Sequence, residues 1–143
     1  MREVARNWII QRKIGLLSQE DIVALADDYI TRHDEFPDWM IDISTNGSLD
    51  REKLLDLMLD PVTDNDCKLI AQQMNDRFIS GELDLHKLAS ACNNLYLLLE
   101  WGSAAFNQLV WISDEVDLID QGYSSPENIE SKIKVALDRV IAL

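Results

Sequence analysis

The stretch LDLHKLASACNNLYLLLEW, residues 83–101, decides the fold class of this chain. Its apolar residues recur at intervals of three and four, which places their side chains on one face of an α-helix. The run from 93 to 101 is the most apolar in the sequence. We therefore expect a central helix over 83–100 that neighbouring helices cover on most sides. Its expected buried face consists of Leu85, Leu88, Ala89, Cys92, Leu95, Tyr96 and Leu99.

The sequence on both sides of this stretch follows the same period. None of it alternates apolar and polar residues with period two, as a half-buried strand would. Ser18 and Thr63 each stand three residues before an Asp, as in a capping box, and Pro126 stands where helices often begin. These patterns predict an all-α bundle of about seven to eight helices in a single domain over 1–143. The expected helices cover 2–14, 19–34, 37–43, 50–58, 64–80, 83–100, 103–121 and 126–141.

The net charge of the chain limits its partners. It has 13 Lys and Arg against 26 Asp and Glu, which gives a formal charge of −13 at pH 7. Such an excess repels phosphate backbones, so we expect no binding to nucleic acid. Basic protein surfaces and metal ions are the natural partners of a chain with this charge.

The cysteines and the N-terminus indicate a cytoplasmic protein. Cys67 and Cys92 belong to no C-x-x-C pair, as expected of buried thiols in a reducing compartment. The first apolar run is broken by Gln11, Arg12 and Lys13, so it lacks the continuous core of a signal peptide. No stretch approaches the ~20 apolar residues that span a bilayer. We expect a cytoplasmic location without membrane contact.

Acidic residues are gathered along the chain instead of alternating with bases. Residues 19–38 contain seven Asp and Glu against a single Arg. Six of these acids fall into two sets spaced by seven residues, which keeps them on one face of a helix, opposite its apolar residues. A second tract, 89–131, contains no Lys or Arg at all. The two sets are Glu20, Asp27 and Asp34, and Asp21, Asp28 and Glu35.

This segregation of charge has two interpretations. A charged helix face is often only a solvated face, but such faces usually mix signs, because opposite charges at i,i+4 contribute about 0.2–0.5 kcal/mol per pair. Gathering like charges forgoes that stabilisation and favours electrostatic steering of a basic partner. We therefore expect a partner-binding surface. Its first-choice acids are Asp27, Asp28, Asp34, Glu35 and Asp38, and its second-choice acids are Asp114, Asp117 and Asp120.

The stretch EFPDWMIDIS, residues 35–44, follows the first acidic tract directly. Phe36 and Trp39 there stand beside carboxylates, a composition typical of binding hot spots, and Trp39 is the expected anchor. The alternative is that this segment folds inward and closes the bundle. The other tryptophans, Trp8, Trp101 and Trp111, lie in apolar helical runs, so we expect them in the core.

An enzyme is the weakest interpretation of the sequence. Asp117 and Asp120 could chelate Mg²⁺ together with Glu127 and Glu130, but only six residues and a turn separate the two pairs. No calcium loop, zinc-ligand pair, glycine-rich phosphate loop or nucleophile motif is present in the sequence. We therefore expect no catalytic activity, no cofactor and no metal.

The pattern GLLSQEDIVALADDYI (15–30), FPDWMIDIS (36–44) and DEVDLIDQG (114–122), on a short, acidic, helical chain, resembles small cytoplasmic bacterial immunity proteins. These proteins belong to polymorphic-toxin and contact-dependent growth inhibition systems. The resemblance implies no catalysis and tight binding to a toxin domain, often a basic nuclease. It assigns no roles to individual residues, and the sequence leaves the oligomeric state open. The alternative function is a helical adaptor or a subunit of a larger assembly.

Overall fold

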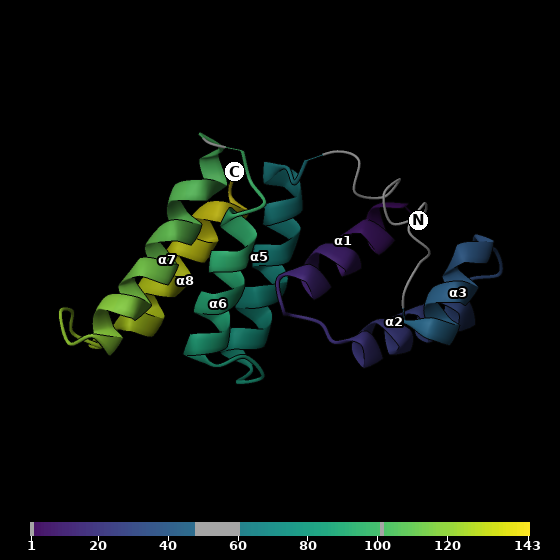
Figure 1. The fold of residues 1–143 in the computed structure, drawn as a ribbon, viewed down its shortest axis with the longest axis horizontal. Helices are drawn as coiled ribbons and strands as arrows, with labels where there is room; N and C mark the ends of the chain where they lie inside the picture. Colours follow the sequence, from purple (N-terminus) through teal and green to yellow (C-terminus); the bar gives the residue numbers. More distant parts are fainter. Residues whose placement is uncertain (1, 48–60, 101) are drawn as a thin grey trace. The chain divides into compact units, whose positions relative to one another are not determined.

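A computed structural model describes residues 2–47, 61–100 and 102–143 of the chain (Figure 1). Within these ranges it contains seven α-helices and no strand, which confirms the all-α prediction. The helix expected at 50–58 and the side chain of Trp101 lie outside the described residues. The helices are α1 (Arg2–Lys13), α2 (Gln19–Arg32), α3 (Asp38–Asn46), α5 (Asp64–Ile79), α6 (Leu85–Tyr96), α7 (Ala104–Asp120) and α8 (Ile129–Ile141).

The chain divides into two compact units, Met1–Asp60 and Pro61–Leu143. The expectation of one domain over 1–143 stays a prediction. No helix in the described part of the chain is long and apolar enough to cross a membrane.

The first unit is built on α2. Its start is fixed by a capping box, in which Ser18 Oγ accepts the Asp21 N–H at 3.1 Å and the Asp21 carboxylate accepts the Ser18 N–H at 2.8 Å. α3 packs along α2, and the two helices bury a common apolar cluster that also takes in α1. The buried members of this cluster are Ala5, Ile22, Ala26, Met40 and Ile43.

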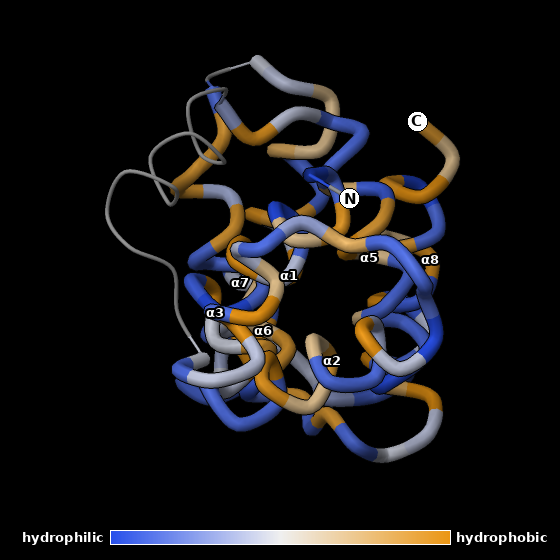
Figure 2. Tube along the Cα trace, turned by 90° about the vertical axis from the view of Figure 1, so that its right-hand side faces the viewer, coloured by the Kyte–Doolittle hydropathy of each residue, from blue (hydrophilic) through white to orange (hydrophobic). Residues whose placement is uncertain are grey.

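The second unit contains four helices that run in alternate directions (Figure 1). α6 packs on α7, α7 packs on α8, and α8 packs on α5. Figure 2 shows hydrophobic residues recurring between hydrophilic ones along these helices, the pattern from which the sequence predicted them. The expected apolar face of α6 is confirmed, since Leu88, Cys92 and Leu95 are fully buried.

Several helix boundaries differ from the prediction, among them the end of α6 and the start of α8. α6 ends at Tyr96 and not at 100, so Leu97 lies in a turn and is 67% exposed. The apolar run continues beyond the end of the helix, and Leu99 past the turn is still buried, as expected. α8 begins at Ile129 and not at Pro126, because the Pro126 carbonyl accepts the Ile129 N–H in a turn and Asn128 adopts a left-handed conformation with φ +58°.

Candidate functional site

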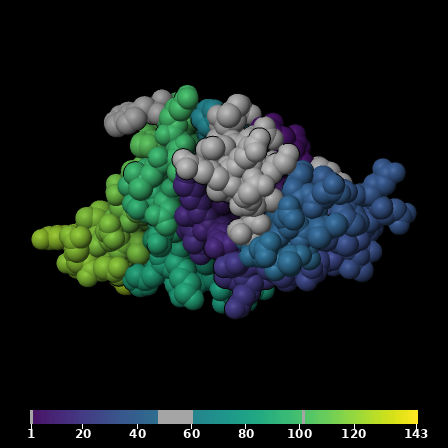
Figure 3. All heavy atoms as spheres, turned by 45° about the vertical axis from the view of Figure 1, so that its right-hand side comes forward, coloured from purple at the N-terminus to yellow at the C-terminus, as the bar shows by residue number. Residues whose placement is uncertain are grey.

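The first-choice acids all belong to the first unit, and all are exposed. Asp27 and Asp28 lie on α2, and Asp38 is the first residue of α3. Asp34 and Glu35 lie in the connection between the two helices, because α2 ends at Arg32 and His33 is extended. The expected acidic stripe of six residues along one helix is therefore wrong, since the last two acids leave the helix. The segment that carries them lies at the surface, in blue, in Figure 3.

Two of these acids are already engaged within the unit. Asp28 accepts a hydrogen bond from Arg32 Nε at 3.0 Å, as an exposed ion pair one turn apart on α2. Asp27 accepts a hydrogen bond from the Ser44 hydroxyl of α3, which ties α2 to α3.

The three remaining acids, Asp34, Glu35 and Asp38, form no ion pair with any described residue. They stand within five residues of one another and are all exposed. We call Asp34, Glu35 and Asp38 the acidic corner. Like charges this close raise the local negative potential, and a basic partner would relieve their repulsion.

Phe36 and Trp39 turn towards the interior of the first unit. Both are partly buried and pack against the cluster around Met40 and Ile43. Most of each ring is therefore packed against the interior of the first unit, as the alternative of an inward-folding segment expects. The role of Trp39 as a binding anchor stays a prediction, which its partly exposed ring permits.

The second-choice acids lie on α7, in the second unit, and are also exposed. Asp120 is engaged, since both of its carboxylate oxygens lie 3.0 Å from His86 Nε2 of α6. This hydrogen bond, together with the negative charge of Asp120, raises the pKa of His86 above its ordinary value of 6.5. Asp114 and Asp117 form no ion pair with any residue that the structure describes.

The described residues offer no cluster for a metal ion. Within residues 2–47, 61–100 and 102–143, no three His, Cys, Asp or Glu side chains lie close enough together to hold one. Glu127 lies in the turn before α8, and Glu130 lies in its first helical turn.

The two cysteines are buried and are not joined in a disulfide. Cys92 Sγ lies 3.9 Å from Met74 Sδ in the core of the second unit. Burial raises the pKa of each thiol to about 12, and the charges of Asp64 and Asp66 add to the effect at Cys67. Burial therefore favours the protonated thiol of each cysteine over the thiolate form that nucleophilic cysteines use.

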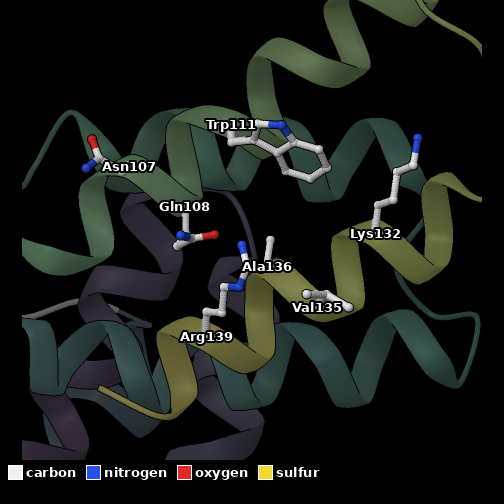
Figure 4. A pocket seen from close by; sticks show the side chains of 7 residues that line it. All are labelled: Asn107, Gln108, Trp111, Lys132, Val135, Ala136 and Arg139. Atoms are coloured by element: carbon white, nitrogen blue, oxygen red, sulfur yellow. The ribbon is translucent and has the colours of Figure 1, made fainter.

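Sequence reasoning missed a pocket between α7 and α8 (Figure 4). The expectation that Trp111 lies in the core is wrong, because its side chain is 37% exposed and lines this pocket. The sequence signal that could have indicated this pocket is a group of three bases within eight residues, Lys132, Lys134 and Arg139. The pocket is lined by Asn107, Gln108, Trp111, Lys132, Val135, Ala136 and Arg139.

A second groove lies in the first unit, where the start of α2 meets the end of α3. It contains one carboxylate and none of the predicted site residues. Its lining residues are Ser18, Gln19, Glu20, Val23, Thr45 and Asn46.

Comparisons with protein-family models, with curated proteins and with solved structures found no match to this chain. Function is therefore inferred from the charges and geometry described above.

Proposed function

We propose that the protein binds a basic protein partner through the acidic corner of its first unit. The observation that supports this most is that Asp34, Glu35 and Asp38 are exposed and form no ion pair with any described residue. Exposed like charges cost stability when they are held together, and a basic surface would turn this cost into attraction. Asp27 and Asp28 of α2 are less available to a partner, because Asp28 is paired with Arg32 and Asp27 accepts a hydrogen bond from Ser44.

The finer proposal is that the partner is a toxin domain, a basic nuclease, which this protein neutralises as an immunity protein. A nuclease binds substrate phosphates with Lys and Arg, and carboxylates on a docked inhibitor compete for those side chains. The support is the sequence resemblance together with the charge of the acidic corner. Trp39, next to Asp38, is the proposed anchor that slows dissociation.

A helical adaptor is the second candidate, and one observation favours it. Several large apolar side chains of the second unit are exposed to solvent. Tyr123 is 80% exposed, and Leu97 is exposed as well. Exposed apolar side chains can mark the contact surface of a larger assembly. An adaptor would bind through these residues, and its binding would respond little to salt.

The proposal predicts that the reading frame immediately upstream encodes a protein with a basic C-terminal nuclease domain, and the experiment uses that domain as the candidate partner. Its nuclease activity is measured with the wild-type protein and with the triple variant Asp34→Lys, Glu35→Lys and Asp38→Lys. We expect the wild type to inhibit and the variant to need at least about ten times more protein, because charge complementarity is reversed.

The matched control changes three exposed acids of the second unit, Asp76→Lys, Glu100→Lys and Asp138→Lys, by the same total charge. We expect this control to inhibit as the wild type does. Equal loss of inhibition in both triple variants would assign the effect to net charge and refute the acidic corner as the binding site.

A further inference from the structure

We propose that the pocket between α7 and α8 binds a small aromatic anion, such as an aryl carboxylate or sulfonate. This inference is independent of the proposed docking of a basic protein, because the ligand has the opposite charge. The cavity holds about 460 Å³, within the range of about 300–1,000 Å³ that is typical of small-molecule sites.

Part of the pocket lining is apolar and consists of Trp111, Val135 and Ala136. Trp111 of α7 is 37% exposed and Val135 of α8 is 49% exposed, so both leave apolar surface open to a ligand. Figure 4 shows the indole ring of Trp111 above Val135 and Ala136. A flat apolar ring could stack on the indole and would remove both surfaces from water.

Two cations lie at the ends of this apolar surface. Lys132 and Arg139 are seven residues apart on α8, which puts them on one face of the helix about 10 Å apart along its axis. Both are exposed, and neither forms an ion pair with a residue in the described ranges. In a chain with a net charge of −13, this is a local site of positive charge.

The polar groups at one end suit an acid group. Figure 4 shows Gln108 of α7 and Arg139 of α8 on the same side of the pocket, with Lys132 on the other side. The guanidinium can donate two parallel hydrogen bonds to a carboxylate or sulfonate, and the Gln108 amide can donate a further one. Lys132 can pair with a second acidic group at the far end of a longer ligand.

The test uses 8-anilinonaphthalene-1-sulfonate as the probe, because it joins a flat aromatic body to an anionic group. Its fluorescence is titrated with the whole chain as wild type, as the double variant Lys132→Gln/Arg139→Gln, and as Trp111→Ala. We expect saturable binding by the wild type and a dissociation constant at least about ten times higher in the double variant. Trp111→Ala should weaken binding as well, and circular dichroism checks that it stays helical.

Two controls keep the proposal falsifiable. The double variant Lys87→Gln/Lys134→Gln removes the same charge from exposed lysines outside the pocket and should bind as the wild type does. The neutral dye N-phenyl-1-naphthylamine, which lacks the sulfonate, should bind the wild type at least about ten times more weakly. Equal affinities of the two double variants, or of the two dyes, would overturn the proposal.

Discussion

At the scale of single residues, Gly47 fixes the end of α3. It adopts φ +67°, the left-handed conformation that favours glycine, and its N–H donates to the Ile43 carbonyl at 2.7 Å. A Cβ atom there would overlap Gln19 Cγ and would stand 3.1 Å from the Gln19 carbonyl oxygen. The close approach of α2 and α3 therefore depends on a residue without a side chain.

Gly47→Ala should lower the free energy of unfolding by about 1–2 kcal/mol because of backbone strain. The loss should be larger still, because the new methyl group forces the Gln19 side chain to move. Urea denaturation measures the loss. Gly81→Ala is the matched control, because Gly81 has φ +83° but a Cβ added there would meet no atom within 4 Å. An equal loss in both variants would contradict the role of the Gln19 contact.

His86 makes the stability of the second unit depend on pH. Because Asp120 raises the pKa of His86 in the folded state, the charged imidazolium is favoured by folding. The contribution of this pair to the free energy of unfolding is fully present below the pKa of His86 in the unfolded chain, about 6.5. It is lost as the pH rises through the higher pKa of His86 in the folded state.

His86→Gln should therefore flatten the fall in unfolding free energy as the pH rises through that window. Urea denaturation at a series of pH values tests this directly. The chain has two histidines, so NMR titration of the wild type and of this variant assigns the raised pKa to one of them. A pH profile that is unchanged in the variant would contradict the pairing with Asp120.

At the scale of helices, the sequence predicted the helix starts that depend on local capping. α2 and α5 start at the expected capping boxes of Ser18 and Thr63, because side chains three residues apart meet without help from the rest of the fold. The end of α6 and the start of α8 could not be predicted in this way. Leu97 continues an apolar run but lies in a turn, and Pro126 opens a turn before the helix.

Ser18→Ala should lower the free energy of unfolding by about 1 kcal/mol, because α2 loses the side-chain acceptor at its first turn. Ser103→Ala is the control. Ser103 is the N-cap of α7, yet its hydroxyl is buried without a hydrogen-bond partner among the described residues, while Asp64 of α5 accepts the Ala105 N–H at 3.2 Å. Thermal unfolding should show a loss for the first variant and none for the second.

At the scale of the whole molecule, the sequence predicted which side chains are exposed better than it predicted which of them meet. Every proposed site acid is exposed. For the acids on α2 and α7 the reason is that they share a helix with a buried apolar face and point away from it. The pairing of Asp120 with His86 joins residues that are 34 positions apart, which sequence spacing does not show. The pocket around Trp111 likewise requires α7 to pack on α8.

The function proposed for this protein depends on a gathered negative surface that steers it to a basic partner. The most direct measurement is the association rate with the basic nuclease domain that the proposal predicts the upstream reading frame to encode. Stopped flow follows it at about 0.1 M and about 1 M salt, where the Debye length falls from about 10 Å to about 3 Å. We predict a fall of about tenfold or more for the wild type. For the triple variant of Asp34, Glu35 and Asp38 we predict a slower rate at low salt and a much smaller fall as the salt rises, because the new lysines repel the basic partner and salt screens that repulsion. A wild-type rate that does not change with salt, or a triple variant that associates as fast as the wild type, would contradict electrostatic steering by the acidic corner.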